Sequence, residues 1–188
     1  EMLAQHAAVI TQERGSLIEK LQPLIEHHYE QFAREDGTVR LSLVDSFLAR
    51  SEEATTPQAY LPLLEGCLAT EIERRTTLLG PHLDDIHFEL NGRSARQFAS
   101  QGQARSLVLA LLVSILHVIE ERISVAPLLL LDDFSSELDE GRMRRFFELL
   151  RQNKYQVFIT GTDLSGHDLT QSDTTLFHVQ KGVIERAN

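Results

Sequence analysis

The residues best suited to chemistry follow an apolar run, Leu128 to Leu131, which leads directly into Asp132 and Asp133. An apolar run this short, opened by Pro127 and closed by charge, is typical of a fully buried parallel strand. The two carboxylates then lie at the carboxyl end of the strand, where open α/β sheets bind their ligands. Mg²⁺ usually reaches a protein through one or two carboxylates together with substrate phosphates. The pattern therefore fits a magnesium–phosphate site, and it fits equally a core strand that ends in a solvated acidic turn.

A second candidate site, Ser100 to Gln103, lies at the start of a helix predicted over residues 103–121. The first backbone N–H groups of a helix have no partner within it, and the helix dipole adds partial positive charge there. Gly102 permits close approach to the backbone, and Ser100 offers a hydroxyl, so this corner could bind an anion. Ser100 could equally be a plain N-cap of the helix.

Length and composition limit the class of protein. The 188 residues predict one moderate domain or two small lobes, and a hydrophobic content of 42% is that of an ordinary globular chain. No apolar run approaches the ~20 residues that a membrane helix needs, so we expect no membrane span. Cys67 is the single cysteine, which excludes an intrachain disulfide and favours a reducing cytoplasm.

The net charge of −10 argues against a broadly basic surface for nucleic acid, but it allows a local basic patch. Arginines cluster between residues 142 and 151, and the arginine side chain is well suited to binding phosphate. The alternative is that this cluster is the solvated face of a helix, as most charged runs are.

The first segment, residues 1–80, is predicted to be a helical arm. Residues 2–34 should form a long helix whose seam has coiled-coil spacing. The seam contains Leu3, Ala7, Ile10, Arg14, Leu17, Leu21, Leu24 and His28. Pro23 should kink or interrupt this helix. A half-buried strand near residues 39–43 precedes a second helix, which Gly80-Pro81 stops, and the two helices should pair as an antiparallel arm.

Two further segments are predicted. Residues 81–125 should contain a hairpin that turns at Asn91-Gly92 and returns over residues 95–98, followed by a deeply buried helix. Residues 126–188 should contain the acidic strand, a helix over residues 140–152, a buried strand over 155–160 and a closing hairpin.

Five motifs, in this order, resemble the RecF family of SMC-like, ABC-type ATPases. They are the segments Gly80 to Asp85, Asn91 to Arg93, Phe98 to Gln103, Leu130 to Asp139 and Val157 to Thr160. The resemblance covers residues 57–163 well and the first helix more loosely. It implies an α/β fold: half of an ABC-type ATPase head, with a mostly parallel sheet flanked by helices, and a helical arm or lobe.

The resemblance also implies roles for matching positions. The signature motif, which contacts the γ-phosphate of ATP held by the opposite protomer, corresponds to Ser100, Gln101, Gly102 and Gln103. Asp132 corresponds to the Walker B residue that orients Mg²⁺ through water, and Asp133 to the catalytic carboxylate that polarises the attacking water. The D-loop, which crosses the dimer interface, corresponds to Ser136, Glu137, Leu138 and Asp139. The switch region corresponds to Thr160, Gly161 and Thr162.

The sequence departs from the family's pattern at two positions and lacks one motif. Gly161 has no side chain to sense a γ-phosphate, and Leu83 stands where the family has an arginine. No Gly-x-x-x-x-Gly-Lys-Ser/Thr phosphate loop occurs, although this loop supplies most contacts to the β- and γ-phosphates. We expect the loop to lie upstream of Glu1, and we expect this segment alone to bind ATP weakly or not at all.

By resemblance, the parent protein would be a cytoplasmic, DNA-binding ATPase of recombination repair and the SOS response. It would bind ATP and Mg²⁺, dimerise around ATP, and help RecO and RecR load RecA at junctions of single- and double-stranded DNA. The parent would hydrolyse ATP slowly, and this segment alone would be inactive. Two alternatives are a structural SMC-like DNA-repair head and a degenerate head that binds without hydrolysis.

Overall fold

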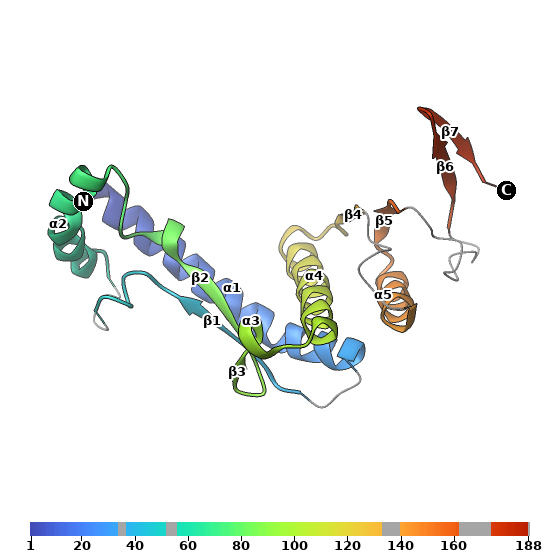
Figure 1. Cartoon of the computed structure of the whole chain (residues 1–188), viewed down its shortest axis with the longest axis horizontal. Coiled ribbons are helices and arrows are strands. Elements are labelled where there is room, and N and C mark those ends of the chain that lie inside the picture. Colours follow the sequence, from blue (N-terminus) through green and yellow to red (C-terminus); the bar gives the residue numbers. More distant parts are fainter. Residues whose placement is uncertain (34–36, 52–55, 133–139, 162–173, 188) are drawn as a thin grey trace. The chain divides into compact units, whose positions relative to one another are not determined.

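The computed structural model describes residues 1–33, 37–51, 56–132, 140–161 and 174–187 (Figure 1). The chain divides into two compact units, Glu1–Val125 and Ala126–Asn188. The first unit combines helices with a three-stranded antiparallel sheet. The second combines a pair of parallel strands, one helix and a two-stranded hairpin, so that parallel pairing among the described strands is confined to this unit.

Helix α1 (Met2–Ala33) is the longest element of the first unit. Its buried residues are Ala4, Ala7, Ile18, Leu21, Ile25, His28, Tyr29, Phe32 and Ala33. The predicted seam was wrong at Leu3, Ile10 and Leu17, which are exposed. The reason is the period: a straight helix turns every 3.6 residues, so a seam read at 3.5 drifts off the buried face. The predicted interruption at Pro23 was also wrong, because the helix continues through it.

A small antiparallel sheet packs on α1. Strand β1 (Val39–Val44) pairs with β2 (Asp85–Leu90), which pairs with the short β3 (Arg93–Ser94). The Gln22 side chain binds β1 twice: its amide donates to the Val39 carbonyl at 2.7 Å, and its oxygen accepts from the Leu41 N–H at 2.7 Å. A helix side chain thus satisfies the backbone of an outer strand, which would otherwise be open to pairing with another chain.

The β2–β3 turn has positive φ angles at Asn91 (54°) and Gly92 (74°), as a tight two-residue hairpin turn requires. The turn was predicted, but the return strand over residues 95–98 was wrong. Pairing ends at Ser94, and α3 (Ala95–Phe98) is a single helical turn. Four residues with an apolar end fit one turn of helix as well as a strand, so their pattern does not distinguish the two.

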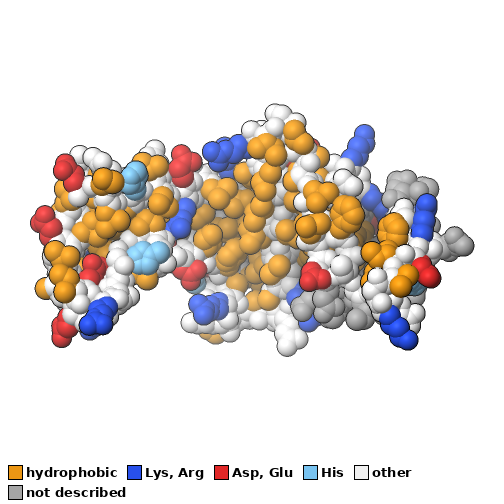
Figure 2. Space-filling view, turned by 90° about the horizontal axis from the view of Figure 1, so that it is seen from above, with side chains coloured by type: hydrophobic (Ala, Val, Ile, Leu, Met, Phe, Trp, Pro, Cys, Tyr) orange, Lys and Arg blue, Asp and Glu red, His pale blue; other side chains and the backbone are white. Residues whose placement is uncertain are grey.

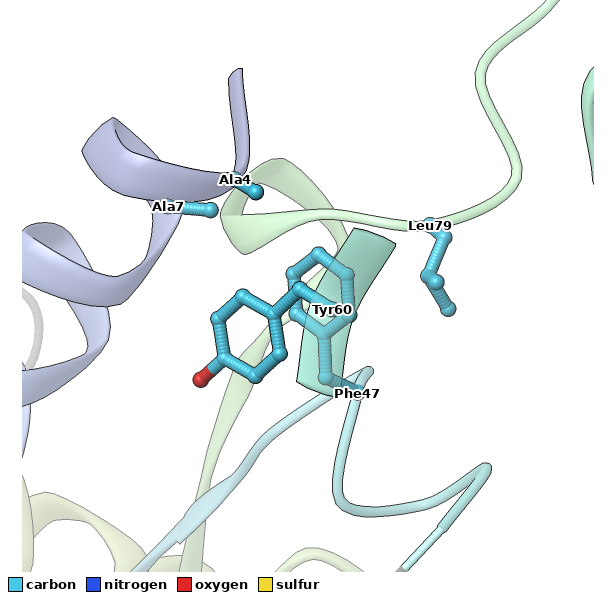
Figure 3. Close-up of a cluster of buried hydrophobic side chains, with 5 residues drawn as sticks. All are labelled: Ala4, Ala7, Phe47, Tyr60 and Leu79. Atoms are coloured by element: carbon cyan, nitrogen blue, oxygen red, sulfur yellow. The ribbon is translucent and has the colours of Figure 1, made fainter. Parts of the chain in front are cut away.

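Helix α2 (Pro57–Arg74) begins at an N-cap, Thr56, whose side chain accepts from the Ala59 N–H, and ends with Arg75 in the left-handed conformation. The predicted stop at Gly80-Pro81 was therefore several residues too late. The helix is joined to α1 by a buried cluster that contains Ala4, Ala7, Phe47, Tyr60 and Leu79 (Figure 3). The Phe47 and Tyr60 rings stack with centroids 3.9 Å apart, and burial raises the pKa of the Tyr60 hydroxyl above its usual value.

Arg14, which breaks the apolar seam of α1, forms an ion pair with Asp84 at 3.0 Å. The Asp84 side chain is only 1% exposed, and it also accepts from the Ser46 N–H at 2.9 Å. Arg14 donates a second bond to the carbonyl of Pro81, in the short helix η1 (Pro81–Leu83). The segment from Gly80 to Asp85 is therefore bound to α1 through a buried carboxylate.

Arg14→Ala should destabilise the chain by about 2 kcal/mol, because it leaves the buried Asp84 carboxylate with less hydrogen bonding to its charge. Urea denaturation followed by circular dichroism measures the change. The control, Arg50→Ala, removes an exposed arginine and should change the free energy of unfolding by less than about 0.5 kcal/mol. Equal stabilities of the two variants would contradict a structural role for the pair.

Helix α4 (Gln101–Ile123) packs on α1 and crosses it at a steep angle (Figure 1). Its buried face carries small residues four apart, Ser106, Ala110 and Ser114, all fully buried. Such residues let a second helix approach closely. The buried Ser114 hydroxyl donates a hydrogen bond to the Ala110 carbonyl of the same helix at 2.7 Å. The helix over residues 103–121 was predicted to be deeply buried, and this was wrong for part of its surface: Val108 is 64% exposed and Ile119 is 38% exposed.

Within the described residues, α4 is the one helix long and apolar enough to cross a membrane. The prediction of no membrane span is not contradicted by this finding, which rests on length and composition only. Core helices pass the same test, and α4 has a face packed against α1.

Hydrophobic side chains also gather on the surface between scattered charged ones (Figure 2).

The second unit contains β4 (Leu128–Leu131) and β5 (Gln156–Ile159), which pair in parallel, and α5 (Glu140–Gln152). The buried side chains of α5 are Met143, Phe146, Phe147, Leu149 and Leu150. The prediction of a fully buried strand was wrong for one face. Leu129 is 6% exposed, whereas Leu128 and Leu130 are 51% and 68% exposed and Phe158, paired with Leu130, is 55% exposed.

The closing hairpin was predicted, and the structure confirms it. Strand β6 (Phe177–Gln180) pairs antiparallel with β7 (Val183–Arg186). Its turn, Lys181-Gly182, has positive φ at both residues.

Candidate functional site

The candidate metal residue Asp132 directly follows β4, and its side chain is held by a residue that follows the neighbouring strand. The Thr160 hydroxyl donates to Asp132 Oδ1, and the Thr160 N–H donates to the Leu131 carbonyl at 2.9 Å. The parallel register, in which Leu131 pairs with Ile159, brings these two positions side by side. The result is an exposed carboxylate at the carboxyl edge of a sheet, oriented by a hydroxyl group.

Two residues of the sequence-predicted site, one assigned to metal and one to the switch region, are thus brought together by strand pairing. Gly161 follows at once and is exposed. The predicted catalytic residue Asp133, the D-loop residues and Thr162 lie outside the described residues. The D-loop residues are Ser136, Glu137, Leu138 and Asp139.

The signature segment forms the first turn of α4, in the other unit. The Ser100 hydroxyl accepts from the Gln103 N–H at 3.2 Å, and Gln103 Oε1 accepts from the Ser100 N–H at 2.9 Å. This reciprocal pair is a capping box, so the N-cap reading of Ser100 is confirmed. Because the box uses the N–H groups of Ser100 and Gln103, the amides left over by the helix itself are those of Gln101 and Gly102. The same geometry therefore suits both a structural cap and an anion site.

Sequence reasoning missed two polar contacts that fix the candidate elements in place. One is the ion pair of Arg14 with Asp84, and the other is a contact between His28 of α1 and His117 of α4. A signal was present in both cases, because Arg14 and His28 are the polar members of an otherwise apolar seam. A polar side chain at a buried position needs a hydrogen-bond or ion-pair partner, but the sequence alone does not show which residue provides it.

Comparison with known proteins shows what the chain is similar to. No protein-family profile matches it. The DNA replication and repair protein RecF of Citrifermentans bemidjiense is 40% identical over 189 residues, which cover 98% of this chain and 51% of that protein. RecF of Listeria welshimeri is 34% identical over 190 residues, which cover 100% of this chain and 51% of that protein. The chain is thus similar to RecF proteins along almost its whole length. It spans about half the length of the curated relatives that it matches.

Solved structures agree. A structure of the recombination mediator protein RecF with ATP, in the RecFOR pathway, matches with a TM-score of 0.78 and 28% identity. The match covers 100% of this chain and 48% of that one. A structure of SMC ATPases matches with a TM-score of 0.52 at 12% identity and shows likeness of fold alone. The α/β fold expected of the RecF family is thereby confirmed.

Ser100→Ala should destabilise the chain by about 1 kcal/mol, because it removes the acceptor for the Gln103 N–H. Ser100→Asp keeps a capping oxygen and should stay within a few tenths of a kcal/mol of the parent chain. Urea denaturation of both variants measures the difference. The same loss of stability in both variants would show that the capping box contributes nothing through its acceptor.

Proposed function

We propose that the chain is the portion of a RecF-like DNA-repair ATPase that carries the Walker B strand and the signature helix. The observation that supports this most is the meeting of Asp132 and Thr160 at the carboxyl edge of the parallel pair, in a chain related to RecF along almost its whole length. An aspartate held by a hydroxyl in this position is suited to a nucleotide-associated cation.

ATP and Mg²⁺ are the proposed cofactors of the parent protein. Mg²⁺ keeps several waters and takes one or two carboxylates, so the exposed Asp132 oxygens fit it as a ligand through water. Bound there, the ion would neutralise charge on the phosphates. In this proposal Thr160 holds the Asp132 carboxylate in one orientation, and Asp133 polarises the attacking water. Phosphoryl transfer depends mainly on such positioning and on charge neutralisation.

The signature residues Ser100, Gln101, Gly102 and Gln103 would contact the γ-phosphate held by a second protomer. The capping box supports this role, because it leaves the Gln101 and Gly102 amides at the positive end of a 23-residue helix. ATP would then join two copies, with the D-loop residues at the interface. The proposed partners of this dimer are DNA at single-strand/double-strand junctions, RecO and RecR, which together load RecA, and the proposed location is the cytoplasm.

DNA contact through α5 is the weaker part of the proposal. Arg144 already pairs with Glu140 on the same helix at 3.4 Å, which supports a solvated helix face. If DNA phosphates are contacted, binding will weaken steeply as salt rises, because the contacts release counterions. Affinity that does not depend on salt would contradict phosphate contacts.

The catalytic assignment can be tested in a protein of the relatives' length that carries this sequence. Asp133→Asn should abolish ATP hydrolysis and spare ATP binding, because the amide cannot polarise water as a carboxylate does. Turnover is measured by phosphate release, and binding by fluorescent-nucleotide titration. Unchanged turnover would remove Asp133 from the mechanism. Absence of hydrolysis in the unmodified protein as well would favour a degenerate head.

The signature role can be separated from the capping role in the same protein. Ser100→Asp keeps the cap but places a negative charge where the γ-phosphate should bind, so ATP-dependent dimerisation should be lost while the fold is kept. Ser16→Asp adds the same charge at an exposed serine of α1 and is the matched control. Light scattering with and without ATP measures dimerisation, and equal dimerisation by both variants would refute the assignment.

A further inference from the structure

Four polar side chains form a chain of contacts where α1 packs on α4. His28 of α1 is 3% exposed, and its Nε2 lies 3.1 Å from Nδ1 of His117 on α4. The two rings are nearly parallel, with centroids 5.1 Å apart. On its other side, His28 Nδ1 lies 3.4 Å from Gln31 Oε1, and Gln31 Nε2 lies 3.2 Å from His27 Nε2. The network thus runs from the buried interface to the surface of α1.

The direction of these hydrogen bonds follows from their atoms. Gln31 Oε1 can only accept, so His28 Nδ1 must carry the proton that it shares with that oxygen. In a neutral imidazole the other nitrogen is then an acceptor, so His28 Nε2 accepts and His117 Nδ1 donates. Gln31 Nε2 donates in turn to His27 Nε2. Donation therefore passes from His117 through His28 and Gln31 to His27, and two of the three acceptors are imidazole nitrogens.

Adding a proton to His28 disrupts this arrangement. The proton must go to Nε2, so His28 can no longer accept from His117 Nδ1, and the contact survives only if His117 moves its own proton from Nδ1 to Nε2. A cation would also lie in a buried interface, where charge is costly unless it is paired. We propose that His28 and His117 form an acid-sensitive contact, which holds α4 on α1 while His28 is neutral and weakens when His28 is protonated.

The charges around His28 act in the same direction. Burial, aided by the neighbouring His117 and His27, lowers the pKa of His28 from 6.5 to about 4, while the bond to Gln31 opposes the shift. On α4, Glu120 is three residues after His117, a spacing that puts the two side chains on the same side of the helix. On β1, which also packs on α1, the one charged residue is Arg40, and it is exposed. No carboxylate is among the causes that act on the pKa of His28.

The direction of the pH effect follows from the two pKa values. Because the folded-state pKa of His28 is below its unfolded value, the unfolded chain binds more protons between about pH 6.5 and 4. The contribution of His28 to stability is complete above pH 6.5 and is lost as the pH falls toward 4. For one proton, the unfolding equilibrium constant can rise up to about tenfold per pH unit in this window. An effect on ATP-dependent pairing, through the signature turn of α4, would follow only if the proposed function holds.

The test is the pH dependence of unfolding of the whole 188-residue chain. Urea denaturation at pH 7.5, 6.5, 5.5 and 4.5 is compared for the parent chain, His28→Gln and His6→Gln. The glutamine amide at position 28 can accept from His117 but does not titrate, and His6 is an exposed histidine of the same helix. Carboxylates contribute equally to all three chains, so the difference between the two variants isolates His28.

We expect the parent and His6→Gln to lose stability below pH 6.5 more steeply than His28→Gln, by up to about tenfold in the unfolding constant per pH unit. Identical slopes in all three chains would overturn the proposal. If His28→Gln does not fold, the imidazole of His28 can be titrated by NMR in the unmodified chain. Protonation near pH 4 supports the proposal, and protonation near pH 6.5 refutes it. Neither measurement uses nucleotide, so neither outcome depends on the proposed ATPase function.

Discussion

The close packing of α4 on α1 is the contact on which the first unit depends. Small residues on α4 allow the two helices to approach, and large side chains of α1, such as Tyr29 and Phe32, are fully buried. The same helix α1 also holds β1 through Gln22 and the segment after α2 through Arg14. Elements that are far apart in sequence are therefore positioned by one helix, α1. The signature residues at the start of α4 are positioned in the same way, because α4 packs on α1.

One of the motifs that resemble the RecF family has a structural role in this chain. The segment Gly80 to Asp85 resembles its family counterpart. Its Asp84 carboxylate forms an ion pair with Arg14 and accepts a hydrogen bond from the Ser46 N–H. Ser46 also exchanges two hydrogen bonds with Gly80, whose φ of 141° suits glycine. The side chain of Leu83, which stands where the family has an arginine, is exposed, and Leu83 joins this network only through its N–H, which donates to the Gly80 carbonyl. A family motif can thus reflect the need to fix a loop rather than contact with ligand.

The sequence predicted which segments form helices and strands better than it predicted how deeply each of them is buried. Periodicity located α1, α4, α5 and the acidic strand, because each has a strong apolar pattern. It misjudged burial at Leu130 and Val108, since an apolar side chain shows what could be buried and not whether another element covers it. The pairing of Asp132 with Thr160 depends on the register of two strands separated by a helix, and the His28–His117 contact spans 89 residues. Single-sequence patterns carry no information on such long-range partners.

The uncovered face of β4 and β5 has a consequence for how the chain behaves in solution. Leu128, Leu130 and Phe158 form an exposed apolar strip on a sheet that has two strands within the described part of the chain. A net charge of −10 keeps separate molecules apart by mutual repulsion at low ionic strength. Added salt shortens the range of that repulsion to about 10 Å at 0.1 M, while apolar attraction is retained. In the isolated chain, charge repulsion therefore opposes association through this strip, and that opposition weakens as salt rises.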